Sequence, residues 1–107
     1  MNKYRIAILG SQDAVLGFKG LGVDAFGLNE SDAAEKLKET VKSGKYAVIF
    51  ITEDWSEKLA QEINEYYEMA LPAIVTVPSP QGTSGAALNN LKRIVEQAVG
   101  SDILFQN

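Results

Sequence analysis

Two short polar segments hold the side chains best suited to chemistry in this chain. The first, Gly10–Asp13 (GSQD), and the second, Thr52–Asp54 (TED), each follow an apolar run. If the two runs are adjacent parallel strands, their carboxyl ends meet at one edge of a sheet, where α/β proteins bind ligands. Carboxylates placed there could hold a divalent metal ion and accept a phosphoryl group, as in a phospho-receiver domain.

The carboxylates in these segments are few for such a metal site. Only Asp13 lies near the first run, although Glu53 or Asp54 could fill the place after the second. A lysine to balance the phosphate is also missing, because none follows the expected fourth strand before Lys92. Helix capping by Asp13, Thr52 and Asp54 explains the same residues more simply, and we favour that interpretation. The alternative is a degenerate receiver or small-ligand-binding domain that uses these two loops.

A third candidate is the loop VPSPQGTSG, which spans Val77–Gly85. Its glycines could aim backbone N–H groups at an anion where a helix begins. However, it has neither the spacing nor the lysine of the phosphate-binding pattern GxxxxGK[ST]. Ser79 and Ser84 have no histidine anywhere in the chain to activate them as nucleophiles. We therefore predict a rigid proline turn with Thr83 or Ser84 as the helix N-cap.

The composition excludes several classes of function. The 107 residues include no cysteine and no histidine, so thiolate chemistry, disulfides and the commonest metal ligands and general base are absent. Ten basic against fourteen acidic residues give a net charge of −4, which does not suit a nucleic-acid phosphate backbone. The N-terminal sequence MNKYRIAILGSQD has an apolar run of only four residues, far short of a signal peptide or a span of about 20 residues. We expect a soluble cytoplasmic protein.

Apolar periodicity predicts alternating strands and helices. Three nearly continuous apolar runs are typical of strands covered on both faces, namely Tyr4–Leu9, Tyr46–Ile51 and Ala73–Val77. A weaker, more nearly alternating segment, Val23–Gly27, suits an edge strand. Helical patterns follow each strand and cover roughly Asp13–Leu21, Asn29–Ser43, Glu53–Met69 and Gly85–Val99.

Local signals refine these helices. Asn29 and Asp32 stand at capping-box spacing before the second helix. Gly17 and Gly20 give the first helix poor intrinsic propensity, so packing must hold it. At the end of the third helical pattern, we expect one ring of the Tyr66–Tyr67 pair in the core and one at its rim.

The order βαβαβαβα predicts a small doubly wound α/β domain, similar in outline to Rossmann and receiver domains. Its four-stranded parallel sheet should have strand order 2-1-3-4 with helices on both faces. We expect a single domain over residues 1–100 and a C-terminal tail over residues 101–107. The tail residues Ile103, Leu104 and Phe105 either fold back on the body or dock on a partner.

Three blocks of sequence carry a resemblance to a known family. They are YRIAILGSQDAVLGFKGLGVDAF, YAVIFITE, and PAIVTVPSPQGTSG with the helix that ends VEQAVGSDIL. In this order, and over essentially the whole chain, they resemble the F subunit of the V-type and A-type rotary ATPases, specifically the bacterial V-type form.

The resemblance implies a noncatalytic protein without cofactor or metal. The F subunit belongs to the central rotor stalk, binds the long coiled coil of the D subunit and turns within the A3B3 catalytic hexamer. It thereby couples ATP hydrolysis or synthesis to H+ or Na+ transport, on the cytoplasmic side and peripheral to the membrane as part of the V1 sector. The resemblance implies no nucleic-acid partner and no insertion into the membrane. Because the family's last helix and tail contact the coiled coil, the predicted partner-binding residues are Leu88, Leu91, Lys92, Val95, Val99, Ile103 and Leu104.

Overall fold

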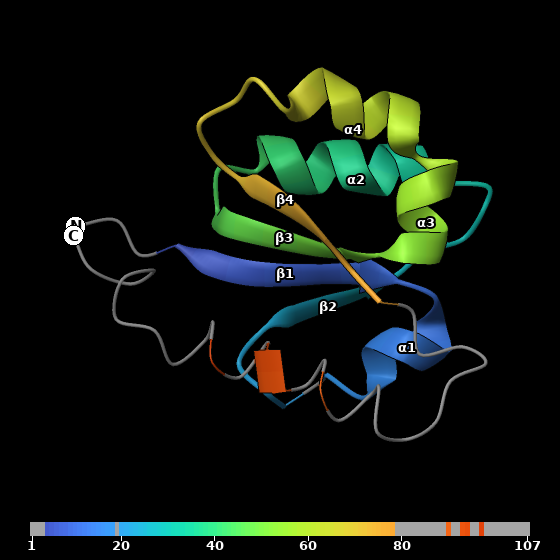
Figure 1. The fold of residues 1–107 in the computed structure, drawn as a ribbon, viewed down its shortest axis with the longest axis vertical. Coiled ribbons are helices and arrows are strands. Elements are labelled where there is room, and N and C mark those ends of the chain that lie inside the picture. The colour runs from blue at the N-terminus through green and yellow to red at the C-terminus, as the bar shows by residue number, and fades with distance from the viewer. Residues whose placement is uncertain (1–3, 19, 79–89, 91–92, 95–96, 98–107) are drawn as a thin grey trace.

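The computed structural model describes residues 4–18, 20–78, 90, 93, 94 and 97. Eight elements follow one another in these ranges, and helices separate successive strands, two of them between β3 and β4 (Figure 1). They are β1 (Arg5–Gly10), α1 (Gln12–Leu16), β2 (Asp24–Gly27), α2 (Ala33–Lys42), β3 (Tyr46–Thr52), α3 (Glu53–Lys58), α4 (Ala60–Tyr66) and β4 (Ala73–Val77).

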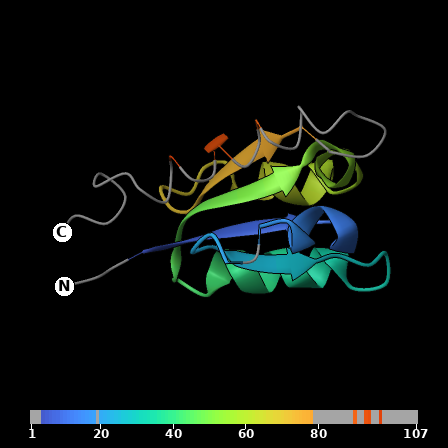
Figure 2. The ribbon, with the colours of Figure 1, turned by 90° about the horizontal axis from the view of Figure 1, so that it is seen from below.

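The four strands form one parallel sheet in the order β2-β1-β3-β4, which confirms the predicted topology. Figure 2 shows the strands side by side in this order. β1 and β3 occupy the centre, and their register places Leu9 beside Ile51. The switch in strand order therefore falls between β1 and β3, as it does in doubly wound folds.

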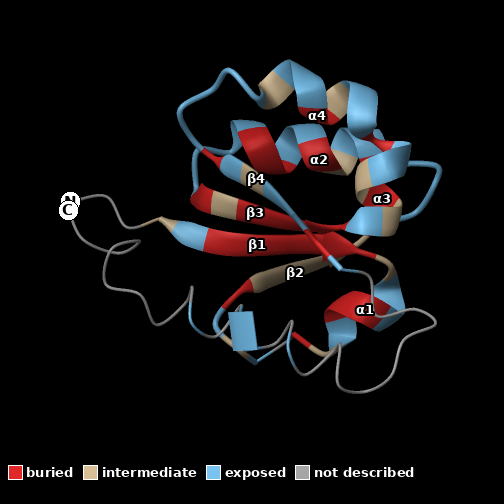
Figure 3. Ribbon diagram, viewed as in Figure 1, coloured by how far each residue is buried: buried red, intermediate tan, exposed pale blue. Residues whose placement is uncertain are grey.

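Two apolar cores lie on opposite faces of the sheet, because successive strand residues point to opposite sides. One face packs against α2, α3 and α4, with Leu9, Ile51 and Leu37 fully buried. The other packs against α1 and the turn after it, with Ile8 and Phe18 fully buried. Figure 3 shows that β1 and β3 are almost entirely buried, as their continuous apolar runs predict.

The prediction that Ala73–Val77 is covered on both faces is wrong. β4 does form there, but it lies at the edge of the sheet and exposes Ala73, Val75 and Thr76. β4 thus has the sequence of a buried strand, but it lies at an edge of the sheet that the described residues do not cover. β2 is the other edge strand, as its weaker alternation predicts.

The second and third helices differ from their predicted outlines. α2 begins at Ala33, and Asp32 occupies the N-cap position without a side-chain capping hydrogen bond, so the predicted capping box is not formed. The single helix predicted over Glu53–Met69 is divided at Leu59, where φ is −106° and ψ is 20°. The predicted apolar stripe nevertheless holds, because Trp55, Leu59 and Ile63 are all buried on the same side of the sheet.

The first helix is shorter than predicted. α1 ends at Leu16, and the chain turns at Gly17, consistent with the low helix propensity of glycine. The next residue, Phe18, is fully buried and anchors the turn, and its backbone N–H donates to the Val15 carbonyl over 2.9 Å. Packing therefore holds this segment, as the sequence indicates.

One polar cluster joins three strands near their amino ends. Arg5 on β1 donates two hydrogen bonds to the Asp24 carboxylate on β2, one of them from Nε over 2.8 Å. Tyr46 on β3 donates its hydroxyl to the same carboxylate over 2.8 Å. The Arg5 guanidinium lowers the pKa of Asp24, whereas burial and the bond to Asp24 raise the pKa of Tyr46 to about 12.

Replacing Tyr46 with phenylalanine should reduce the free energy of unfolding at neutral pH by about 1 kcal/mol, the usual worth of one hydrogen bond. A raised pKa means that the folded state holds the tyrosine proton more tightly than the unfolded state. This stabilisation is therefore complete below the ordinary tyrosine pKa of 10.0 and is lost as the pH rises through about 12. Urea unfolding at several pH values should show the gap between wild type and Tyr46→Phe narrowing over that interval. Tyr67→Phe, at an exposed hydroxyl, is the control, and a gap for Tyr46→Phe that stayed constant with pH would contradict the assignment.

Candidate functional site

The two polar segments singled out in the sequence lie together at the carboxyl ends of β1 and β3. Gly10 ends β1 and Thr52 ends β3, and the two residues pack closely. A Cβ atom built on Gly10 would lie only 2.7 Å from Thr52 Oγ1. The structure thus places the candidate loops at the switch point of the sheet, as predicted.

Three buried oxygen atoms at this switch point make no hydrogen bond with the protein atoms that the structure describes. They are Ser11 Oγ, Thr52 Oγ1 and Asp54 Oδ1. Ser11 and Thr52 occupy the N-cap positions of α1 and α3, but neither forms a side-chain capping bond. The capping interpretation is therefore right about the position of Thr52 and wrong about its bond. The prediction that Asp13 and Asp54 are helix caps is wrong, because they lie inside the first turns of these helices, where the helix dipole favours a negative charge.

The described residues do not provide the metal site of a receiver domain. No group of three or more acidic residues that could hold a metal ion occurs among them. Asp13 and Glu53 are exposed, while Asp54 is half-buried. The carboxylates are thus as sparse in space as they are in the sequence, which weakens the receiver and small-ligand alternative.

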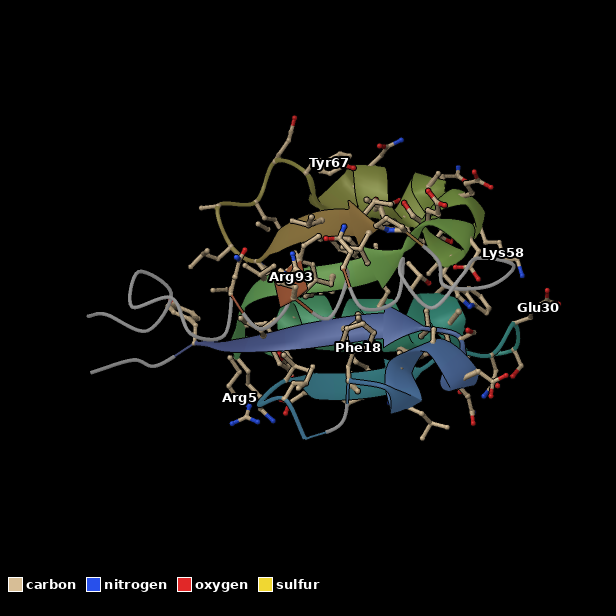
Figure 4. All side chains as sticks on the ribbon, turned by 60° about the horizontal axis from the view of Figure 1, so that its bottom comes forward. Arg5, Phe18, Glu30, Lys58, Tyr67 and Arg93 are labelled. Atoms are coloured by element: carbon tan, nitrogen blue, oxygen red, sulfur yellow. The ribbon has the colours of Figure 1, made fainter. Side chains whose placement is uncertain are left out.

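All seven predicted partner-binding residues lie outside the described residues. The same is true of the loop after Pro78 and of the tail over residues 101–107. Four described residues of the predicted last helix, Asn90, Arg93, Ile94 and Gln97, have helical backbone and are exposed. In Figure 4, Arg93 lies on the same side of the sheet as Phe18, the side that carries α1.

Four large apolar side chains are exposed on β4 and on the connection that leads into it, namely Tyr67, Met69, Leu71 and Val75. Val75 lies beside Phe50 and faces the α1 side of the sheet, whereas Tyr67 follows α4 on the other side. The prediction of one tyrosine in the core and one at its rim is wrong by one step outward: Tyr66 is only half-buried against the apolar cluster, and Tyr67 is exposed (Figure 4).

None of the described helices has the length and apolar character needed to cross a membrane.

Comparison with known proteins identifies the family. The model of the family described as ATP synthase (F/14-kDa) subunit matches residues 6–95. The chain belongs to this family. A V-type ATP synthase F subunit from Clostridium perfringens is 38% identical over 105 residues, covering 97% of this chain and 100% of the relative. A V-type ATP synthase F subunit from Fusobacterium nucleatum is 36% identical over 101 residues, covering 94% and 96%.

Archaeal members of the F-subunit family also match. An A-type ATP synthase F subunit from Pyrococcus abyssi is 35% identical over 106 residues, covering 92% of this chain and 97% of the relative. The family predicted from the three sequence blocks is therefore confirmed. Since the family name describes one component of an ATP synthase, the surfaces of this chain that contact other components matter most for its function.

Proposed function

We propose that this chain is the noncatalytic F subunit of the central rotor stalk in a bacterial V-type ATPase. In this role it binds the coiled coil of the D subunit and turns with it inside the A3B3 hexamer. The rotation couples ATP hydrolysis or synthesis to H+ or Na+ transport. The protein works on the cytoplasmic side, peripheral to the membrane as part of the V1 sector.

The observation that carries the proposal is the whole-chain match to V-type ATP synthase F subunits. The relatives and this chain cover nearly all of each other's length, so no large insertion or missing domain separates them. The composition agrees with a noncatalytic role, because a chain without histidine or cysteine lacks the commonest groups for general base and thiolate catalysis.

The proposed contact with the D subunit uses the last helix and the tail. Its anchors are the seven predicted residues, which run from Leu88 to Leu104. Apolar residues at helical spacing suit a groove on a coiled coil, where side chains interdigitate at i, i+3, i+4 and i+7. Lys92 would pair with acidic groups of the partner, although an exposed ion pair contributes under about 1 kcal/mol.

A truncation tests this contact. Removing residues 101–107 takes away Ile103 and Leu104 and should weaken binding to the D subunit of the same organism by about tenfold, or about 1.4 kcal/mol. Isothermal titration calorimetry with the full chain and with the chain ending at Gly100 measures the difference. Matching far-ultraviolet circular dichroism spectra would show that the truncated chain is folded.

Two outcomes would count against the proposal in different ways. If neither form bound the D subunit at low micromolar concentration, the stalk role itself would be contradicted. If both forms bound equally tightly, the stalk role would stand, but the tail would not take part in the contact with the D subunit.

A further inference from the structure

We draw no further inference here: the strongest candidate, the cluster of buried oxygen atoms of Ser11, Thr52 and Asp54 at the carboxyl ends of β1 and β3, lies at the starts of two short helices, and nothing among the described residues shows what these atoms bind.

Discussion

Replacing Phe18 with alanine is expected to lower the free energy of unfolding by about 4 kcal/mol, within the range for deleting a buried aromatic ring. Phe18 is fully buried in the apolar cluster beneath α1, together with Ile8 and Phe50. It also holds a helix of only five residues, whose sequence has little tendency to stay helical without packing. The loss should therefore combine a cavity with loosening of α1.

Chemical unfolding of the isolated chain measures this effect. Leu16→Ala is the matched control, because Leu16 lies two residues away and is 57% exposed, so it should cost less than about 0.5 kcal/mol. A larger fall in stability for Leu16→Ala than for Phe18→Ala would mean that α1 packs through the opposite side. That result would contradict the described core on this face of the sheet.

The second large effect is expected at the switch point, where Gly10→Ala should destabilise the protein by about 2 kcal/mol through overpacking. The new Cβ atom would lie 2.7 Å from Thr52 Oγ1 and 2.8 Å from Thr52 Cγ2. Thr52 is fully buried on a central strand and branched at Cβ, so it cannot easily move aside. The strain is therefore specific to this pair of residues.

A double-mutant cycle tests that explanation. Thr52→Ala removes both close atoms, so adding it to Gly10→Ala should recover part of the lost stability. Gly27→Ala is a useful comparison, because the atom nearest its new Cβ is Gln12 Cγ at 2.6 Å and Gln12 is exposed. Gly27→Ala should accordingly cost less than Gly10→Ala. Strictly additive effects of Gly10→Ala and Thr52→Ala would contradict the proposed clash.

The central part of the fold could be predicted because its signals are local and strong. The apolar runs of β1 and β3 are covered on both faces, and the order of elements leaves few topologies for a parallel sheet. Helix boundaries were less predictable. The interruption at Leu59 leaves the apolar stripe intact, so periodicity did not reveal it.

The exposure of β4 could not be predicted from its own residues. Its sequence resembles that of β3, yet β4 lies at the end of the strand order and the described residues leave it uncovered. A continuous apolar run indicates that a strand needs apolar surroundings. It does not indicate whether the same chain or a partner provides them. The mismatch between sequence and exposure at Val75 is for that reason the informative feature of this edge.

The switch-point residues show a similar limit of prediction from sequence. Sequence position correctly placed Thr52 at a helix start, but it missed Ser11 as the N-cap of α1 and could not show whether either hydroxyl reaches the backbone. Such a bond depends on side-chain rotamers and on the angle at which each helix leaves its strand. The family, and through it the proposed role, came from sequence resemblance rather than from these loops.

The stalk function is tested most directly by assembly. The A, B and D subunits of the same organism would be expressed with and without this chain, purified through a tag on the A subunit and weighed intact by native mass spectrometry. We expect the A3B3D complex to gain the mass of one copy of this chain, and we expect the chain to leave with the D subunit when the complex is dissociated. An A3B3D complex that forms but never takes up this chain, even when the chain is in excess, would contradict the stalk function.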